Sequence, residues 1–155
     1  MKTKSVDTPL SEITLRRYEK PYNLTKRELV RKLCLSLGLL NPGDSRDVIV
    51  DVLYVLLEAA KDKKKLSSDQ IREEVLAFRK QEKLNDLGTA ASNIRRQIRR
   101  LRELLLVEKV KNDYRITEFT NLADTFNEKV EKFMIPSIIE RIKEYLDTVD
   151  ETFMK

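Results

Sequence analysis

The stretch SNIRRQIRRLRELLLVEKV, residues 92–110, decides the fold because its hydrophobic period changes part-way along. In its first part the apolar residues recur every three or four positions, which is the spacing of an amphipathic helix. Thr89 stands at the start of this pattern, so we expect a helix over residues 89–105. The residues expected on its buried face are Ala90, Ile94, Ile98, Leu101 and Leu105.

The residues that follow this helix favour a β-hairpin. The helical spacing is lost there, and Asn112-Asp113 lies between two β-favourable runs. Asn and Asp tolerate the positive φ that a tight turn requires. We therefore expect two short antiparallel strands, near 106–110 and 114–118.

Five arginines crowd the predicted helix, where only Glu103 carries the opposite charge. They are Arg95, Arg96, Arg99, Arg100 and Arg102. Like charges three or four residues apart destabilise a helix, so the cluster predicts a compensating anion. Two sources stay open at this point. One is a nucleic acid, and the other is carboxylates, either of this chain (Glu73, Glu74 or the C-terminal helix) or of a protein partner.

The composition narrows the class of protein. The 155 residues include 3 Gly and 4 Pro, too few turn residues for an all-β sandwich, so a mainly helical chain is expected. The sequence contains no His and a single Cys. It therefore lacks the usual ligands of a zinc site and the usual base of a catalytic site. A single Cys also cannot form an internal disulfide. We expect no enzyme, no metal and no cofactor.

Neither a signal peptide nor a membrane span is apparent in the sequence, because no stretch approaches the ~20 apolar residues that a span needs. We therefore expect a cytoplasmic protein that does not enter a membrane. The many Glu and Lys residues, with few Gln, point to a thermophilic source.

Residues 1–22 are expected to form a flexible basic arm that is able to contact phosphates. Three more helices are expected between this arm and the arginine-rich helix. A first helix lies within residues 23–41, where Thr25 and Glu28 fit a capping box. The second and third follow short polar segments that can cap them. Their expected caps are Asp44 or Ser45 for the second helix and Ser67 or Ser68 for the third.

The order helix, helix, helix, hairpin resembles a winged helix-turn-helix, with Gly88 in the turn before the last helix. The stretches IRRQIRRLRELLLVEKV and YRITEFTNLAD in particular are similar to DNA-binding domains of the prokaryotic and archaeal regulator type. The resemblance implies a three-helix core with a two-stranded wing over residues 44–119. The hairpin VKNDYRI is shorter and less basic than many wings of that family.

This resemblance assigns candidate DNA contacts, because the N-terminal half of such a helix approaches base edges. Candidates for base contacts are Thr89, Ser92, Asn93 and Arg96. Candidates for phosphate contacts are Arg99 and Arg100 on the helix and Lys109, Lys111 and Arg115 on the hairpin. The remaining arginines of the cluster, Arg95 and Arg102, lie at the apolar edge of the helix and are expected to be structural.

Residues 120–155 are expected to be helical again, with a break or kink at Pro136. Their apolar residues continue farther than a small domain can cover, so we expect a homodimer formed through them. The candidate dimer residues are Phe126, Phe133, Ile138, Ile142, Tyr145 and Val149.

The leading interpretation is a dimeric regulator of transcription that binds double-stranded DNA sequence-specifically, with residues 89–105 in the major groove. Two alternatives remain open. One is a protein-assembly module of a replication, transcription or segregation complex, whose partner would meet the arginine face. The other is an architectural DNA binder. RNA binding is less favoured, because the aromatic content is only 6%.

Overall fold

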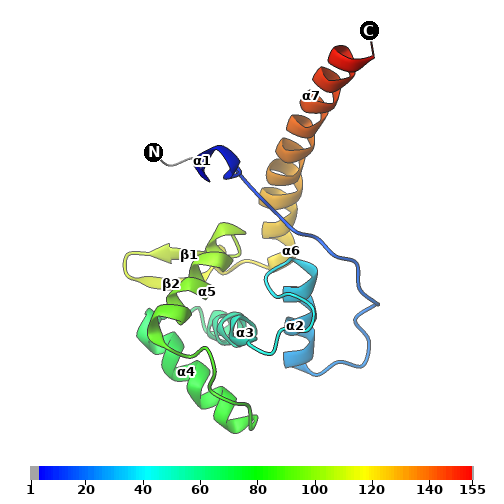
Figure 1. Ribbon diagram of the computed structural model, residues 1–155. Helices are drawn as coiled ribbons and strands as arrows, with labels where there is room; N and C mark the ends of the chain where they lie inside the picture. Colours follow the sequence, from blue (N-terminus) through cyan, green and yellow to red (C-terminus); the bar gives the residue numbers. More distant parts are fainter. Residues whose placement is uncertain (1–3, 155) are drawn as a thin grey trace.

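The computed structural model describes residues 4–154, and it is mainly helical with one small antiparallel sheet. Residues 1–3 of the expected arm and residue 155 of the C-terminal element lie outside this part. Figure 1 shows a helical bundle with the hairpin at its side and one long helix projecting from it. The elements are α1 (Lys4–Asp7), α2 (Lys26–Ser36), α3 (Val48–Lys61), α4 (Ser68–Gln81), α5 (Ala91–Glu103), β1 (Val107–Val110), β2 (Asp113–Ile116), η1 (Thr117–Phe119), α6 (Leu122–Thr125), η2 (Phe126–Met134) and α7 (Ile135–Phe153).

Helix α3 forms the centre of the core. It packs against α2, α4, α5 and β2, and a helix surrounded in this way needs apolar residues on nearly all sides. Its buried residues are Val48, Ile49, Val50, Asp51, Val52, Leu53, Val55, Leu56 and Ala59. A single charged residue, Asp51, is therefore enclosed within an otherwise apolar helix.

Two of the predicted helix starts are confirmed and one is wrong. Thr25 with Glu28 and Ser67 with Gln70 form complete capping boxes at α2 and α4. Helix α3 begins only after Asp47, so neither Asp44 nor Ser45 caps it. The side chain of Asp47 makes no cap hydrogen bond either.

Helix α5 is shorter than expected at both ends. Ala90 is its exposed N-cap residue, and the helix ends at Glu103. Leu105 then adopts φ 65° and is 38% exposed, whereas Leu104 is buried. Leu104 therefore occupies the core position that the periodicity predicted for Leu105, because α5 ends before Leu105.

The hairpin is present; β1 begins one residue later than expected, and β2 begins one residue earlier and ends two residues earlier. Val107 pairs with Ile116, and Val110 pairs with Asp113. Asp113 is thus the first residue of β2, and the positive φ of the turn falls on Lys111, at 58°, rather than on Asp113. The connection before α4 adds a bridge that the sequence did not suggest, because Leu66 exchanges two backbone hydrogen bonds with Tyr114, of 3.0 and 2.7 Å.

The segment before α2 is extended and runs along this helix (Figure 1). Arg16, which belongs to the expected phosphate-contacting arm, is bound within the chain. Its guanidinium donates to the carbonyls of Leu35 and Leu40, at 2.9 and 3.0 Å, near the C-terminal end of α2. Carbonyls at a helix C-terminus lack intrahelical donors, so Arg16 stabilises this end of α2.

Of the break or kink expected at Pro136, the break is wrong, because the C-terminal helix is continuous there. Segment η2 has π-helical pairing, in which the N–H of Ile135 donates to the carbonyl of Val130 five residues earlier. Pro136 has no N–H to donate, and it stands where this wider pairing ends and α7 begins. The helix therefore continues to Phe153, and α7 has no buried residue among those described.

Candidate nucleic-acid interface

The outer face of α5 is strongly cationic. Its exposed residues are Ser92, Arg95, Arg96, Arg99, Arg102 and Glu103. Within residues 6–154, no carboxylate lies within ion-pair distance of the first three of these arginines. The internal anions considered from the sequence, Glu73, Glu74 and the C-terminal helix, do not reach this face. The cluster is therefore open to an external anion.

The buried face of the same helix fixes its position. Ile94, Ile98 and Leu101 are almost completely inaccessible to solvent, and α5 packs on α3, α4 and β1. Burying three such side chains contributes roughly 1.5–3 kcal/mol each. The arginines opposite them are thus held on a rigid element.

Thr89 is not available for a base contact, which corrects the prediction. It is 6% exposed, and its hydroxyl donates to the carbonyl of Asp86 at 2.6 Å. Its own carbonyl accepts a 2.7 Å hydrogen bond from Nε of Arg72. Thr89 belongs to the turn between α4 and α5 because the helix begins two residues later than its sequence pattern suggested.

Asn93 and Arg100 are partly buried and already bonded within the chain. The amide of Asn93 donates to the carbonyl of Gly88 at 2.7 Å, and its oxygen accepts from Gln97 at 2.9 Å. Arg100 donates to the side-chain oxygen of Gln97 at 3.0 Å and to the carbonyl of Gly38 at 3.4 Å. Asn93 thus connects α5 to its preceding turn, whereas Ser92, Arg96 and Arg99 are the predicted contact residues of α5 that are exposed.

The predicted hairpin residues differ in their surroundings. Lys111 is exposed in the turn, and Lys109 lies 5.9 Å from the ring centroid of Tyr114. Arg115 instead pairs with Glu108 at 2.7 Å and stacks over Phe119. Burial by itself would raise the pKa of Glu108, but the N–H of Glu118 and the charge of Arg115 lower it below its ordinary value. The charge of Arg115 is therefore neutralised inside the hairpin.

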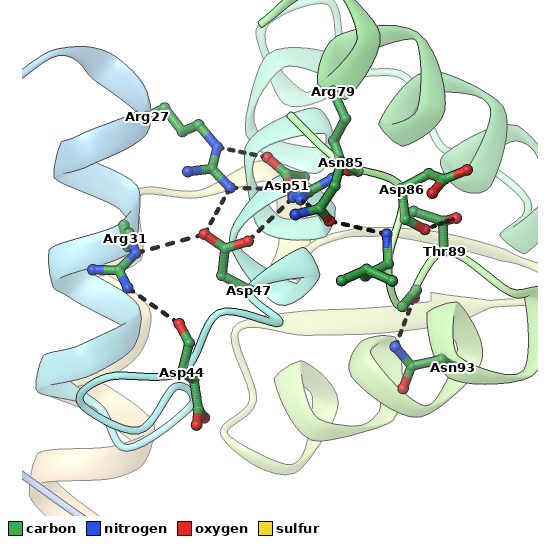
Figure 2. Close-up of polar contacts among 12 residues, drawn as sticks. Arg27, Arg31, Asp44, Asp47, Asp51, Arg79, Asn85, Asp86, Thr89 and Asn93 are labelled. Atoms are coloured by element: carbon green, nitrogen blue, oxygen red, sulfur yellow. Dashed lines mark hydrogen bonds and ion pairs between the residues drawn. The ribbon is translucent and has the colours of Figure 1, made fainter. Parts of the chain in front are cut away.

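A network of buried charged side chains holds the turn before α5 in place (Figure 2). The sequence did not predict this network. Arg79 of α4 pairs with Asp51 of α3 and, at 3.2 Å, with Asp47, the residue before α3. Arg27 of α2 joins the same two carboxylates, at 2.8 and 3.1 Å. The guanidinium of Arg79 also donates to the carbonyl of Asn85 at 2.6 Å. Three helices and the turn are thereby joined through four side chains.

The side-chain amide of Asn85 connects Arg79 to the backbone of the turn between α4 and α5. Its oxygen accepts from the N–H of Leu87 at 3.0 Å and from Arg79 at 3.3 Å. The α4–α5 turn is therefore fixed by hydrogen bonds at both of its ends, from Arg79 at the start and from Asn93 at the close. An arginine in a polar helix is expected at the surface, so the sequence alone does not show that Arg79 is buried.

The pKa values of Asp47 and Cys34 are both shifted from their ordinary values. Burial acts to raise the pKa of Asp47, but the guanidinium groups of Arg27 and Arg79 outweigh it and lower the pKa below the ordinary 3.8. Burial raises the pKa of the Cys34 thiol to about 12. Cys34 is completely inaccessible and acts as a small core residue.

Phe126 differs from the other predicted dimer residues in its contact with the core of its own chain. It is partly buried against the core, as is Met134. Phe133 is 73% exposed. On α7 the predicted Ile138 is partly exposed, and Ile142, Tyr145 and Val149 are at least half-exposed. The same helix also exposes Ile139, Leu146 and Phe153.

The described residues offer neither a metal centre nor a membrane span. Within residues 6–154, no group of three or more His, Cys, Asp or Glu side chains is arranged to hold a metal. None of the described helices combines the length and the apolar character needed to cross a membrane. Neither a family model, a curated protein nor a solved structure matches this chain. Function must therefore be inferred from the side chains themselves.

Proposed function

We propose that the protein binds double-stranded DNA through α5 as a dimeric winged helix-turn-helix regulator of transcription in the cytoplasm. The observation that carries this proposal is the row of unpaired arginines on the outer face of α5. A helix fits the major groove of DNA, and arginines can meet both guanine edges and phosphates there. No carboxylate within residues 6–154 competes for Arg96 or Arg99.

The order of the elements supports the winged-helix part of the proposal. Helices α3, α4 and α5 are followed by the hairpin β1–β2, and the nine residues 82–90 join α4 to α5. The bridge between Leu66 and Tyr114 adds the connection before α4 to the edge of the hairpin. A helix-turn-helix with an attached hairpin presents its second helix outward, as α5 is presented here.

The roles of the open residues follow from their places along α5. Ser92 and Arg96 lie in the N-terminal half, where such a helix approaches base edges. Arg96 is the candidate for a bidentate contact to guanine. Arg99 lies one turn later and suits a phosphate. Lys111 at the hairpin turn is the exposed cation best placed to reach the backbone from the wing.

The homodimer part of the proposal rests on α7. Its exposed apolar residues follow an alternating spacing of three and four, namely Ile139, Ile142, Leu146, Val149 and Phe153. This spacing is that of a coiled-coil seam. Each large side chain buried in such a seam contributes roughly 1.5–3 kcal/mol. A second copy of the chain offers the same seam, and a two-fold pair would present two α5 helices to DNA.

The test is selection of bound sequences from a random duplex pool by the full chain, with the double variant Arg96→Ala, Arg99→Ala as control. We expect enrichment of a palindrome by the wild type and its loss in the variant. Tight binding without enrichment would favour an architectural DNA binder. Absence of duplex binding at low salt would overturn the proposal and leave the arginine face for an acidic protein partner.

A further inference from the structure

A notch lies between the α2–α3 turn and α5, on the side of the helix opposite to Arg102, which lies over Tyr114 of the hairpin. Its volume is about 210 Å³, and its lining includes three arginines, Arg46, Arg96 and Arg100. Arg46 comes from the turn, and the other two come from α5. The sequence singled out the arginines of α5 but gave no reason to associate Arg46 with them, because about fifty residues separate the two segments.

The charges that line the notch are unbalanced. Asp44 is the single acidic residue in its lining, and its carboxylate already accepts a 3.2 Å hydrogen bond from the N–H of Asn41. Arg46 and Arg96 are exposed and have no ion-pair partner within residues 6–154. Arg100 uses two of its five N–H donors within the chain and keeps the others. Cationic donors thus exceed acceptors in the notch.

The start of α3 adds a second, independent attraction for an anion. Val48 and Ile49, the first two residues of this 14-residue helix, line the notch. Asp47 occupies the N-cap position but makes no cap hydrogen bond, because its carboxylate is held by Arg27 and Arg79. A helix start without a side-chain cap keeps a partial positive charge and unsatisfied N–H groups; here these are the groups of Val48 and Ile49, because the N–H of Val50 donates to the carbonyl of Asp47 at 3.0 Å. Phosphate groups bind readily at such helix starts.

We propose that this notch is a binding site for a phosphate group, supplied by the DNA backbone when α5 lies in the groove. This inference rests on the proposed function and deepens it, since it gives Arg46 a role in DNA binding. It also sets the position of one backbone strand, beside the α2–α3 turn and on the opposite side of α5 from the hairpin. Arg96 would then lie between this phosphate and the base edges.

The experiment compares the full chain with the variants Arg46→Gln and Arg141→Gln. Both variants lose one exposed arginine, but Arg141 lies on the projecting helix α7 (Figure 1). Duplex affinity is measured by fluorescence anisotropy over a series of salt concentrations. Arg46→Gln is expected to reduce the slope of log affinity against log salt by about 0.9, the value for one phosphate contact. Arg141→Gln is expected to leave the slope unchanged.

A second arm separates the possible sources of the phosphate. Inorganic phosphate is titrated into the isotope-labelled full chain, and the amide resonances of Val48 and Ile49 are followed. Shifts that disappear in Arg46→Gln, with an unchanged duplex slope, would assign the site to a small phosphate compound and overturn the DNA source. An unchanged slope without such shifts would overturn the site altogether. If the wild type binds no duplex, the proposed function fails and this second arm alone decides the notch.

Discussion

Asp51 and Arg79 form an ion pair at the centre of the helical bundle, where their side chains are 0% and 3% exposed. Each has a further partner of opposite charge, because Arg27 also binds Asp51 and Asp47 also binds Arg79. Removing charges from water is costly, so a group of this kind is stable only while every member is paired. The network is therefore sensitive to the loss of any one side chain.

The Asp51→Asn variant should be strongly destabilised, because two guanidinium groups would remain buried with one carboxylate between them. We expect the free energy of unfolding in urea to fall by about 3–5 kcal/mol. Asp62→Asn, which changes an aspartate outside the network at the end of α3, should alter it by less than about 0.5 kcal/mol. Equal losses in the two variants would contradict the role of the network.

The same network predicts a loss of stability in acid. The pKa of Asp47 is lower in the folded chain than its ordinary 3.8, so the unfolded state takes up a proton first as the pH falls. The stabilising contribution is full above the ordinary value and is lost as the pH drops through the folded value. Urea unfolding measured from about pH 6 to about pH 2 should show this decline. In Asp47→Asn, which is less stable at neutral pH, the decline should be shallower.

Arg96 and Arg99 should differ in how they affect DNA binding. Arg99→Gln should weaken binding to all sequences alike and lower the salt slope by about 0.9. Arg96→Ala should instead reduce discrimination at one base pair, by roughly 1–3 kcal/mol. Anisotropy titrations with the selected site and with single-base variants of it would distinguish the two effects. The same salt slope and the same discrimination in both variants would contradict these roles.

The seam on α7 predicts that one charge is enough to separate the dimer. Ile142→Glu places a carboxylate among apolar residues of the partner helix, where an unpaired charge is strongly unfavourable. Sedimentation velocity should then show a monomer, with unchanged helical content by circular dichroism. Glu151→Gln, about 180° away from Ile142 around the helix, should leave the wild-type dimer intact. A monomeric wild type would refute the dimer itself.

Cys34 should be a sensitive reporter of opening of the core. Its thiol is buried and its pKa is raised to about 12, so almost no thiolate is present near neutral pH, and the thiolate is the reactive form. Iodoacetamide should leave the native protein unmodified at about pH 8 and should modify it in urea, as mass spectrometry can show. Rapid modification of the native chain would indicate that α2 opens from the core.

The parts of the fold that follow a local pattern could be predicted from the sequence. The capping box at Thr25 and the N-cap at Ser67 or Ser68 are defined within four residues, and the stripe of Ile94, Ile98 and Leu101 is defined within one helix. The end of α5 was misplaced because Leu104 and Leu105 are both apolar, so the pattern does not show where the helix stops. A break or kink was expected at Pro136, because the π-helical pairing with which the helix continues there has no distinct signal in sequence.

The buried charges could not be predicted, because their burial depends on partners that are distant in the chain. Asp47 and Asp51 have the spacing of a polar helix face, and Arg79 follows other polar residues of α4. Only the docking of α2, α3 and α4 shows that these residues face one another. The same reason applies to Thr89 and Asn93, whose polar side chains suit either a turn or a DNA contact. Arg96 and Arg99 were placed correctly on the outer face because helical spacing alone determines it.

The bridge between Leu66 and Tyr114 limits the motion of the hairpin. Two backbone hydrogen bonds attach β2 to the connection between α3 and α4, and β1 is joined to α5 by a short segment. Only the few hairpin residues around Lys111 are thus not held by hydrogen bonds or by a short connection to the rest of the described chain. Ordering backbone on binding costs roughly 1–2 kcal/mol per residue, and most of the hairpin has already lost this freedom on folding. The hairpin is therefore preorganised, and it loses little conformational entropy when a partner binds to it.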